Sequence, residues 1–396
     1  MRISETRGER NNTVNTLTET TKRNEGIDLL RIVSMFFVMM LHTLGQGGVL
    51  YAGTDVANVR VAWALEIIAF GAVDIFAMIS GYVGYSEKKK PFRVSKYVMT
   101  WLMVFTYSVV LIFVQNALIE GSVNGATITL SFFPVTSSLY WYFTAYTGLF
   151  VLMPLLDVAV RTLSEDKLKK VLFVLLIVFS GFDFWADKFI PGNGYSMTWL
   201  VVLYLIGAII KKCDIGANIK SKSLVLIIVL CAFFTWVWKM NAPGFTFLNI
   251  GISGNTMVDY VSPTMVISSM AYVILFSRIR VKKGGDLQKF IRFCAPAVFA
   301  AYIINCHTFI WWYFLAGRFA FLAQRSVLEI IGVVVGFSAL FLGAAVLIER
   351  GRMALVEVLR IKKGVEWLED KIRGVIFRPK KENLYKSVDG SDKWEL

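Results

Sequence analysis

The chain has 396 residues, of which 56% are hydrophobic, and its mean hydropathy is +0.60. This composition excludes a soluble globular enzyme, because a membrane-spanning helix needs about 20 mostly apolar residues and the chain offers many such stretches. The formal net charge is +14, but the distribution of the basic residues argues against a nucleic-acid-binding protein. The sequence therefore predicts an all-α, polytopic integral membrane helix bundle.

Ten apolar stretches predict about ten transmembrane helices. They cover residues 26–44, 61–85, 97–115, 139–160, 171–186, 196–210, 223–239, 262–277, 293–316 and 326–348. With both termini in the cytoplasm, most of the 42 Lys and Arg residues fall on the cytoplasmic side, as the positive-inside rule requires. We expect three parts: a disordered cytoplasmic tail over 1–25, a ten-helix membrane domain over 26–348, and a cytoplasmic amphipathic helix and tail over 349–396.

The first predicted span carries ionisable residues within an apolar run. Arg31 and His42 are eleven residues apart, about three helical turns, so both point to one face, and Asp28 lies one turn before Arg31. An arginine at the centre of a spanning helix costs about 2.5–3.5 kcal/mol, so it usually has a function or a partner. The alternative is that Arg31 reaches the headgroups and pairs with Asp28. His42 lies deeper, and nothing nearby in the sequence satisfies it.

The second span and the loop after it add further candidates. Glu66 lies at a depth similar to that of His42, and Asp74 lies near the middle of the membrane, where it either serves the site or bonds a neighbouring helix. Arg93 and Lys96 follow, one turn apart at the start of the third span. They either reflect topology alone or bind a phosphate-bearing cytosolic donor.

Two later spans carry aromatic and histidine residues. Trp141 and Tyr142 begin the fourth span, where they form either an interfacial aromatic belt or a platform for sugar rings. The ninth span contains His307, so both histidines of the chain are expected inside the membrane at matching depth. The four cysteines lie in or beside different spans without a CxxC pair, so we expect neither a disulfide framework nor a metal site. The polar first 25 residues do not predict a cleavable signal peptide.

Several motifs together resemble the membrane acyltransferase-3 family, which O-acylates bacterial polysaccharides and related cell-envelope sugars. They are Asp28-x-x-Arg31 with His42, GAVDIFAMISGY (71–82), WYFTAYTGLFVLMPLLD (141–157), AYIINCH (301–307) and LIER (347–350). The chain departs from the family pattern at three positions. Lys96 stands where a second arginine is usual, Ala77 replaces an aromatic residue, and Leu139 replaces a histidine that many members carry.

The resemblance implies transfer of an acyl group, expected to be acetyl, from cytoplasmic acyl-CoA to a hydroxyl of a surface polysaccharide or lipid-linked glycan. His42 would be the general base, with a covalent acyl-imidazole as the alternative. Arg31 would hold polar groups of the donor or neutralise developing charge, and Asp28 would orient Arg31. Glu66 or Asp74 would orient His42. The remaining candidates divide into donor-binding residues (Arg93, Lys96) and acceptor-binding or orienting residues (Glu66, Asp74, Trp141, Tyr142, His307).

The resemblance further implies acyl-CoA as a co-substrate rather than a bound cofactor, and a multi-pass location in the bacterial plasma membrane. The expected partners are membrane lipids, acyl-CoA, the glycan acceptor and proteins of polysaccharide biosynthesis, without nucleic acid. The alternative function is a proton-coupled transporter of a small solute or lipid-linked sugar, which would use the same buried ionisable residues as a proton path. The sequence shows no internal repeat with paired broken helices, and this weakens the transporter alternative.

Overall fold

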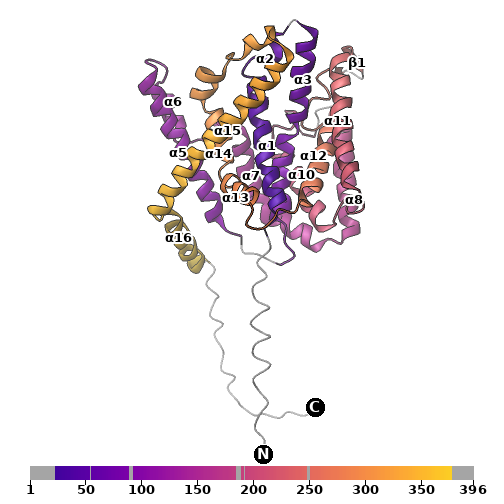
Figure 1. Cartoon of the computed structure of the whole chain (residues 1–396). Coiled ribbons are helices and arrows are strands. Elements are labelled where there is room, and N and C mark those ends of the chain that lie inside the picture. The colour runs from indigo at the N-terminus through magenta and orange to yellow at the C-terminus, as the bar shows by residue number, and fades with distance from the viewer. Residues whose placement is uncertain are drawn as a thin grey trace, which may run out of the picture.

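The computed structural model describes residues 23–53, 55–88, 92–183, 189–190, 192–247 and 250–376. This part of the chain forms an all-α bundle around a central first helix, as the sequence predicted (Figure 1). Its one small extended element is an antiparallel hairpin of β1 (Phe245–Phe247) and β2 (Ile250–Ile252). Most of the two predicted disordered tails, and both termini, lie outside the described residues, so their location stays a prediction.

In chain order, the helices are α1 (Glu25–Leu44), α2 (Val49–Ala52), α3 (Val56–Phe70), α4 (Ala72–Gly84), α5 (Val94–Leu118), α6 (Gly125–Ser131), α7 (Trp141–Thr162), α8 (Glu165–Leu176), the π-helix η1 (Ile177–Phe182), α10 (Met197–Lys212), α11 (Ser221–Asn241), α12 (Pro263–Ser277), α13 (Asp286–Cys294), α14 (Phe299–Cys306), the π-helix η2 (Ile310–Leu315), the 3₁₀-helix η3 (Ala320–Gln324), α15 (Val327–Val358) and α16 (Ile361–Ile376).

Where the structure describes them, the ten predicted spans fall mainly on helix, but the helices differ in length and continuity. Among the described residues, six helical segments are long and apolar enough to cross a membrane, or seven if the bent pair α13 and α14 forms one span. Helix α12 is apolar but has only 15 residues. The polytopic helical architecture is thus confirmed, and the number of crossings stays a prediction.

Glycines allow the helices of the second predicted span to pack closely. The span is broken at Gly71, whose carbonyl accepts a hydrogen bond from Ser269 of α12 (3.3 Å). A Cβ atom on Gly81 would lie 1.8 Å from the backbone oxygen of Tyr204, and one on Gly207 would lie 2.0 Å from that of Met78. Helices α4 and α10 therefore touch backbone to backbone, as small residues permit in membrane bundles.

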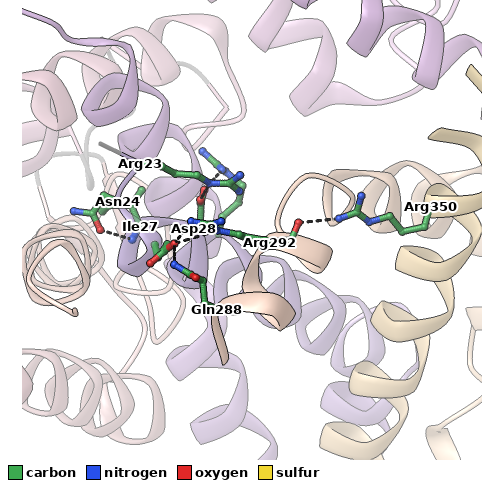
Figure 2. Close-up of polar contacts among 9 residues, drawn as sticks. Arg23, Asn24, Ile27, Asp28, Gln288, Arg292 and Arg350 are labelled. Carbon is green, nitrogen blue, oxygen red and sulfur yellow. Dashed lines mark hydrogen bonds and ion pairs between the residues drawn. The ribbon is translucent and has the colours of Figure 1, made fainter. Parts of the chain in front are cut away.

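Cationic side chains gather where α1, α5 and α11 begin and where α7, α10, α12 and α15 end. We call this the basic end; it points downward in Figure 1 and is the end that the charge pattern predicts to be cytoplasmic. Helix α13 lies across it. Figure 2 shows Gln288 and Arg292 of α13 pointing to the start of α1, and Arg350 of α15 reaching α13 from the other side.

Candidate functional site

A cavity of about 540 Å³ lies beside the second half of α1, away from the basic end. Its volume lies within the range of small-molecule sites, about 300–1,000 Å³. Its walls come from α1, α3, α4, α7, α14 and η2 and from connecting segments. The lining residues are Met35, Val38, Leu41, His42, Gly45, Gln46, Glu66, Phe70, Ala72, Val73, Phe76, Leu139, Trp141, Tyr142, Tyr195, Tyr260, Phe299, Tyr302, Cys306, Thr308, Trp311 and Trp312. Four of the residues selected from the sequence therefore share this cavity: His42, Glu66, Trp141 and Tyr142.

His42 is held in the cavity wall by Asn305 of α14. The Nδ1 atom of His42 lies 2.6 Å from Oδ1 of Asn305, and the amide is almost fully buried. An amide oxygen only accepts hydrogen bonds, so Nδ1 carries the proton and Nε2 keeps its lone pair in the neutral ring. The ring of Trp311 packs against the imidazole edge to face, with 4.9 Å between centroids. The contact with Asn305 therefore leaves His42 with a basic nitrogen.

The face of α1 that carries His42 continues to Arg31. Met35, Val38 and His42 all line the cavity, and Arg31 is the next residue on the same stripe toward the basic end, since these positions follow the helical i, i+4, i+7, i+11 spacing. The Arg31 side chain keeps a quarter of its surface exposed. Arg31 therefore shares the helix face of His42, as predicted, but it lies outside the lining of the cavity, which begins at Met35.

Asp28 fixes the position of Arg31. Its Oδ1 atom accepts a hydrogen bond from Nη1 of Arg31 (2.7 Å), and its Oδ2 atom accepts one from Nε of Arg23. The ion pair that the sequence suggested is therefore present, shared with a second arginine. A partly exposed guanidinium still has further N–H donors in its fork for a ligand.

The start of α1 is tied to the rest of the basic end by a polar network. Glu25 accepts hydrogen bonds from Arg292 (Nη2, 2.8 Å) and from Gln288 of α13 (Figure 2). Arg350 of α15 donates hydrogen bonds to the backbone oxygens of Arg292 (2.8 Å) and Phe293 (2.7 Å). These bonds attach the C-terminal end of α13 to α15. Helix α13 thus holds the end of α1 that presents Arg31.

Another part of the cavity lining is aromatic and contains one carboxylate. Trp141 contacts Tyr195 and Tyr260, with ring centroids 4.6 Å and 6.3 Å away. Glu66 is 8% exposed, and among the described residues its Oε2 atom has no hydrogen-bond partner. The hydroxyl group of Tyr142 is also buried and also has no hydrogen-bond partner among them. These two groups line the cavity and can bond only to something that enters it.

Asp74 lies outside the lining of this cavity. It is fully buried and accepts a hydrogen bond from Nε1 of Trp199 (3.0 Å), so it links α4 to α10. This is the helix-to-helix contact considered from the sequence as the alternative for Asp74. The hydrogen bond to His42, which the sequence offered to Glu66 or Asp74, is made by Asn305 instead.

His307 also lies outside the lining, although it is only two residues from Asn305. It is fully buried, its Nε2–H donates to the backbone oxygen of Ser108 (3.2 Å), and its Nδ1 accepts from the N–H of Phe309 (3.1 Å). Both ring nitrogens are therefore used within the protein, which leaves none for an acceptor substrate.

Arg93 and Lys96, the predicted donor-binding pair, have different surroundings. Arg93 forms ion pairs with Asp370 and with Glu369 (3.8 Å), both on α16. Lys96 is exposed and lines a separate groove at the basic end. The guanidinium of Arg93 is thus engaged by two carboxylates of α16.

Sequence reasoning missed Asn305, Tyr195 and Tyr260. Asn305 carried a usable signal, because it is a polar side chain inside an apolar span and directly precedes Cys306 and His307. The two tyrosines carried none, since each lies in a connecting segment and reaches the site only through packing against Trp141. Among the described residues, no group of three or more His, Cys, Asp or Glu side chains could hold a metal ion.

Comparison with known proteins gives one positive result. A family model described as an acyltransferase domain, that of the acyltransferase-3 family, matches residues 24–349, which is most of the chain and includes every wall of the His42 cavity. No curated protein and no solved structure matches the chain. The extent of the family match is decisive: the chain belongs to the membrane acyltransferase-3 family.

Proposed function

We propose that this membrane acyltransferase moves an acyl group, acetyl in the simplest case, from cytoplasmic acyl-CoA to a hydroxyl of a surface polysaccharide or lipid-linked glycan. The observation that carries the proposal is the histidine of the cavity. His42 has one ring nitrogen fixed by Asn305 and the other available, in a pocket large enough for a sugar. The expected location is the bacterial plasma membrane, where proteins of polysaccharide biosynthesis would supply the acceptor.

The donor would approach from the basic end. Arg31 and His42 lie on one face of α1, separated by eleven residues or about 16.5 Å along the helix axis. A long, thin pantetheine arm suits this distance, with Arg31 binding its polar groups and the thioester reaching His42. Asp28 keeps the guanidinium in place, so that little side-chain freedom is lost when the donor binds.

The chemistry needs one proton transfer in each direction. Nε2 of His42 takes the proton of the acceptor hydroxyl while the hydroxyl oxygen attacks the thioester carbonyl. The C–S bond then breaks, the CoA thiolate leaves, and the imidazolium returns the proton to the sulfur. Asn305 stabilises the required tautomer throughout, because its amide oxygen accepts from Nδ1–H in both charge states of the ring.

The acceptor would bind against the aromatic wall. The flat rings of Trp141 and Tyr260 suit the apolar face of a sugar ring, and the free carboxylate oxygen of Glu66 suits its hydroxyl groups. A site built to hydrogen-bond a hydroxyl discriminates strongly against ligands without one, because its buried polar groups would stay unpaired. Glu66 and Tyr142 therefore favour a polyhydroxylated acceptor.

The test uses the full chain, purified and reconstituted in liposomes with radiolabelled acetyl-CoA and a mixture of bacterial glycans. We expect label to leave acetyl-CoA and to appear in an ester of the glycan, and we expect His42→Ala to lose this activity. Protein that never cleaves the thioester but carries solute or protons across the liposome would replace this proposal with the transporter alternative.

A further inference from the structure

A second cavity, of about 720 Å³, lies at the basic end between α5, α15 and α16. Figure 1 shows α16 beyond the ends of α5 and α15, on the side of the bundle away from α11. The groove shares no lining residue with the His42 cavity. Its lining residues are Ser95, Lys96, Met99, Thr100, Met103, Pro296, Glu349, Arg350, Arg352, Met353, Ala354, Val356, Glu357, Arg360, Lys362, Lys363 and Glu366.

The groove has a surplus of positive charge. Six lining residues are basic and three are acidic. Glu349 is neutralised by Arg352 (2.7 Å), and Glu366 lies 3.9 Å from Lys362. In the part of the chain that the structure describes, no carboxylate lies within ion-pair distance of the three exposed cations Lys96, Arg360 and Lys363. These three cations are available to an anion.

The remainder of the groove is apolar. Met99 and Met103 of α5 face Met353 of α15, and Pro296 adds a further apolar contact. Methionine side chains are flexible and adapt to irregular hydrocarbon shapes. A basic mouth joined to a methionine-lined interior suits an amphiphile with an anionic head and a hydrocarbon tail.

The wall formed by α16 is held in place by specific contacts. Glu369 accepts hydrogen bonds from the backbone N–H groups of Val94 (2.9 Å) and Ser95 (3.2 Å), so it caps α5, which has no side-chain cap of its own. Arg93 pairs with Asp370, and Arg373 pairs with Glu369 (3.0 Å). The groove is therefore a built feature of the fold rather than a gap beside a loose helix.

We propose that this groove binds the phosphate headgroup of an anionic lipid of the cytoplasmic leaflet. Lys96, Arg360 and Lys363 would contact the phosphate, and an acyl chain would lie along Met99 and Met103. Acyl-CoA has the same chemistry, a phosphate head and an acyl tail, but it fits the position less well. No lining residue comes from α1, so a donor bound here would not follow the Arg31 face that leads to His42.

The test measures lipid selectivity of the full chain in detergent-lipid micelles with spin-labelled phosphatidylglycerol and phosphatidylcholine as probes. The variant Arg360→Gln with Lys363→Gln removes two cations of the groove from exposed positions. Because each of these cations would contact the bound phosphate directly, we expect the preference for phosphatidylglycerol to fall roughly ten- to a hundred-fold. The matched control, Lys289→Gln with Lys371→Gln, removes the same charge from exposed positions of α13 and α16 outside the groove. Its preference should stay unchanged.

Two results would overturn the proposal. An unchanged preference in the groove variant, or an equal loss in the control, would show that lipid selectivity does not arise in the groove. Unchanged lipid preference together with weaker binding of coenzyme A to the groove variant would assign the groove to the nucleotide of the donor. The measurement needs no catalytic turnover, so its outcome is independent of the proposed acyl transfer.

Discussion

The two histidines of the chain are alike in sequence context and different in their surroundings. His42 lies within an apolar helix and His307 directly follows one, and both were expected at the same depth. The ring of His42 lines a cavity and is bonded only through Nδ1, to Asn305 and, at 3.9 Å, to Sγ of Cys306. The ring of His307 is fully buried, and both of its nitrogens are bonded. The available nitrogen, rather than burial or depth, is what makes a histidine fit for proton transfer.

His307 nevertheless shapes the site. It ends α14, and its backbone oxygen accepts a hydrogen bond from the N–H of Trp311 (2.8 Å) at the start of η2. Its side chain ties the same turn to Ser108 of α5. This turn places the ring of Trp311 against His42. His307 thus stabilises the turn that positions Trp311, and Trp311 in turn packs against His42.

The largest expected effect is a reciprocal pair of substitutions. His42→Ala should reduce acyl transfer by about 10²–10⁴-fold, the usual contribution of a general base, with little change in the melting temperature of the purified protein. His307→Ala should lower the melting temperature, because it removes the side-chain bond to Ser108 of α5 and leaves the buried N–H of Phe309 without its partner, at a cost of about 1–3 kcal/mol. The folded fraction should keep much of its activity.

The comparison would break if these outcomes were exchanged. A His42→Ala protein with full activity would remove the general-base role. A His307→Ala protein that melts like the unmodified chain but is inactive would show that His307 takes part in the reaction. Activity must be normalised to the folded fraction, measured by size-exclusion chromatography.

A second prediction asks whether the functional face of α1 extends to Arg31. Arg31→Lys keeps the charge but loses the planar fork of donors. If the fork binds the donor, apparent affinity for acyl-CoA should drop roughly ten- to a hundred-fold, the value of a charge-assisted contact of about 1.5–3 kcal/mol. If Arg31 only balances Asp28, activity should stay within a few-fold.

The double change Asp28→Asn with Arg31→Gln is the control for this prediction. It removes the pair together, so a purely structural pair should be partly rescued relative to either single change. We expect no rescue. Recovered activity would show that the pair stabilises the start of α1, and the donor site would then lie elsewhere. Since Arg23 also bonds Asp28, Arg23→Gln should be tested in parallel.

Features set by the periodicity of a single helix could be predicted from the sequence, whereas contacts between two helices could not. The stripe from Asp28 to His42 follows from helical periodicity, which is a local property. The bond between Asn305 and His42 joins residues 263 positions apart, and it exists only because α14 packs against α1. The break at Gly71 likewise needs Ser269 of α12. The last predicted span ended at residue 348, but α15 continues to Val358 and forms one side of the basic groove.

The third prediction sharpens the role of that long-range bond. Asn305→Ala should lower kcat by about ten-fold, since the loss of a hydrogen bond worth about 1.5 kcal/mol frees the ring to adopt the wrong tautomer. The KM for acyl-CoA should not change, because Asn305 does not contact the donor path. Asn305→Asp keeps an accepting oxygen and should restore part of kcat. Equal losses in both variants, or a change confined to KM, would contradict this positioning role.

The smallest expected effect concerns Glu369, a carboxylate that works structurally, as His307 does. Burial by itself raises its pKa, but hydrogen bonds from Ser95 and from the backbone N–H groups of Val94 and Ser95 outweigh burial, so the pKa lies below its ordinary value of 4.5. A carboxylate with a lowered pKa in the docked state stabilises docking above its ordinary value and loses this effect as the pH falls through the lowered one. The contacts of α16 with α5 should therefore be complete at neutral pH and should weaken a few-fold below about pH 4.5.

Hydrogen–deuterium exchange of the backbone at residues 94–98, corrected for the intrinsic effect of pH, measures this weakening. In Glu369→Gln the same amides should exchange faster already at pH 7, with little further change on acidification. A pH dependence that persists in this variant would assign the acid-sensitive contact to another group, with the Arg93–Asp370 pair as the next to test.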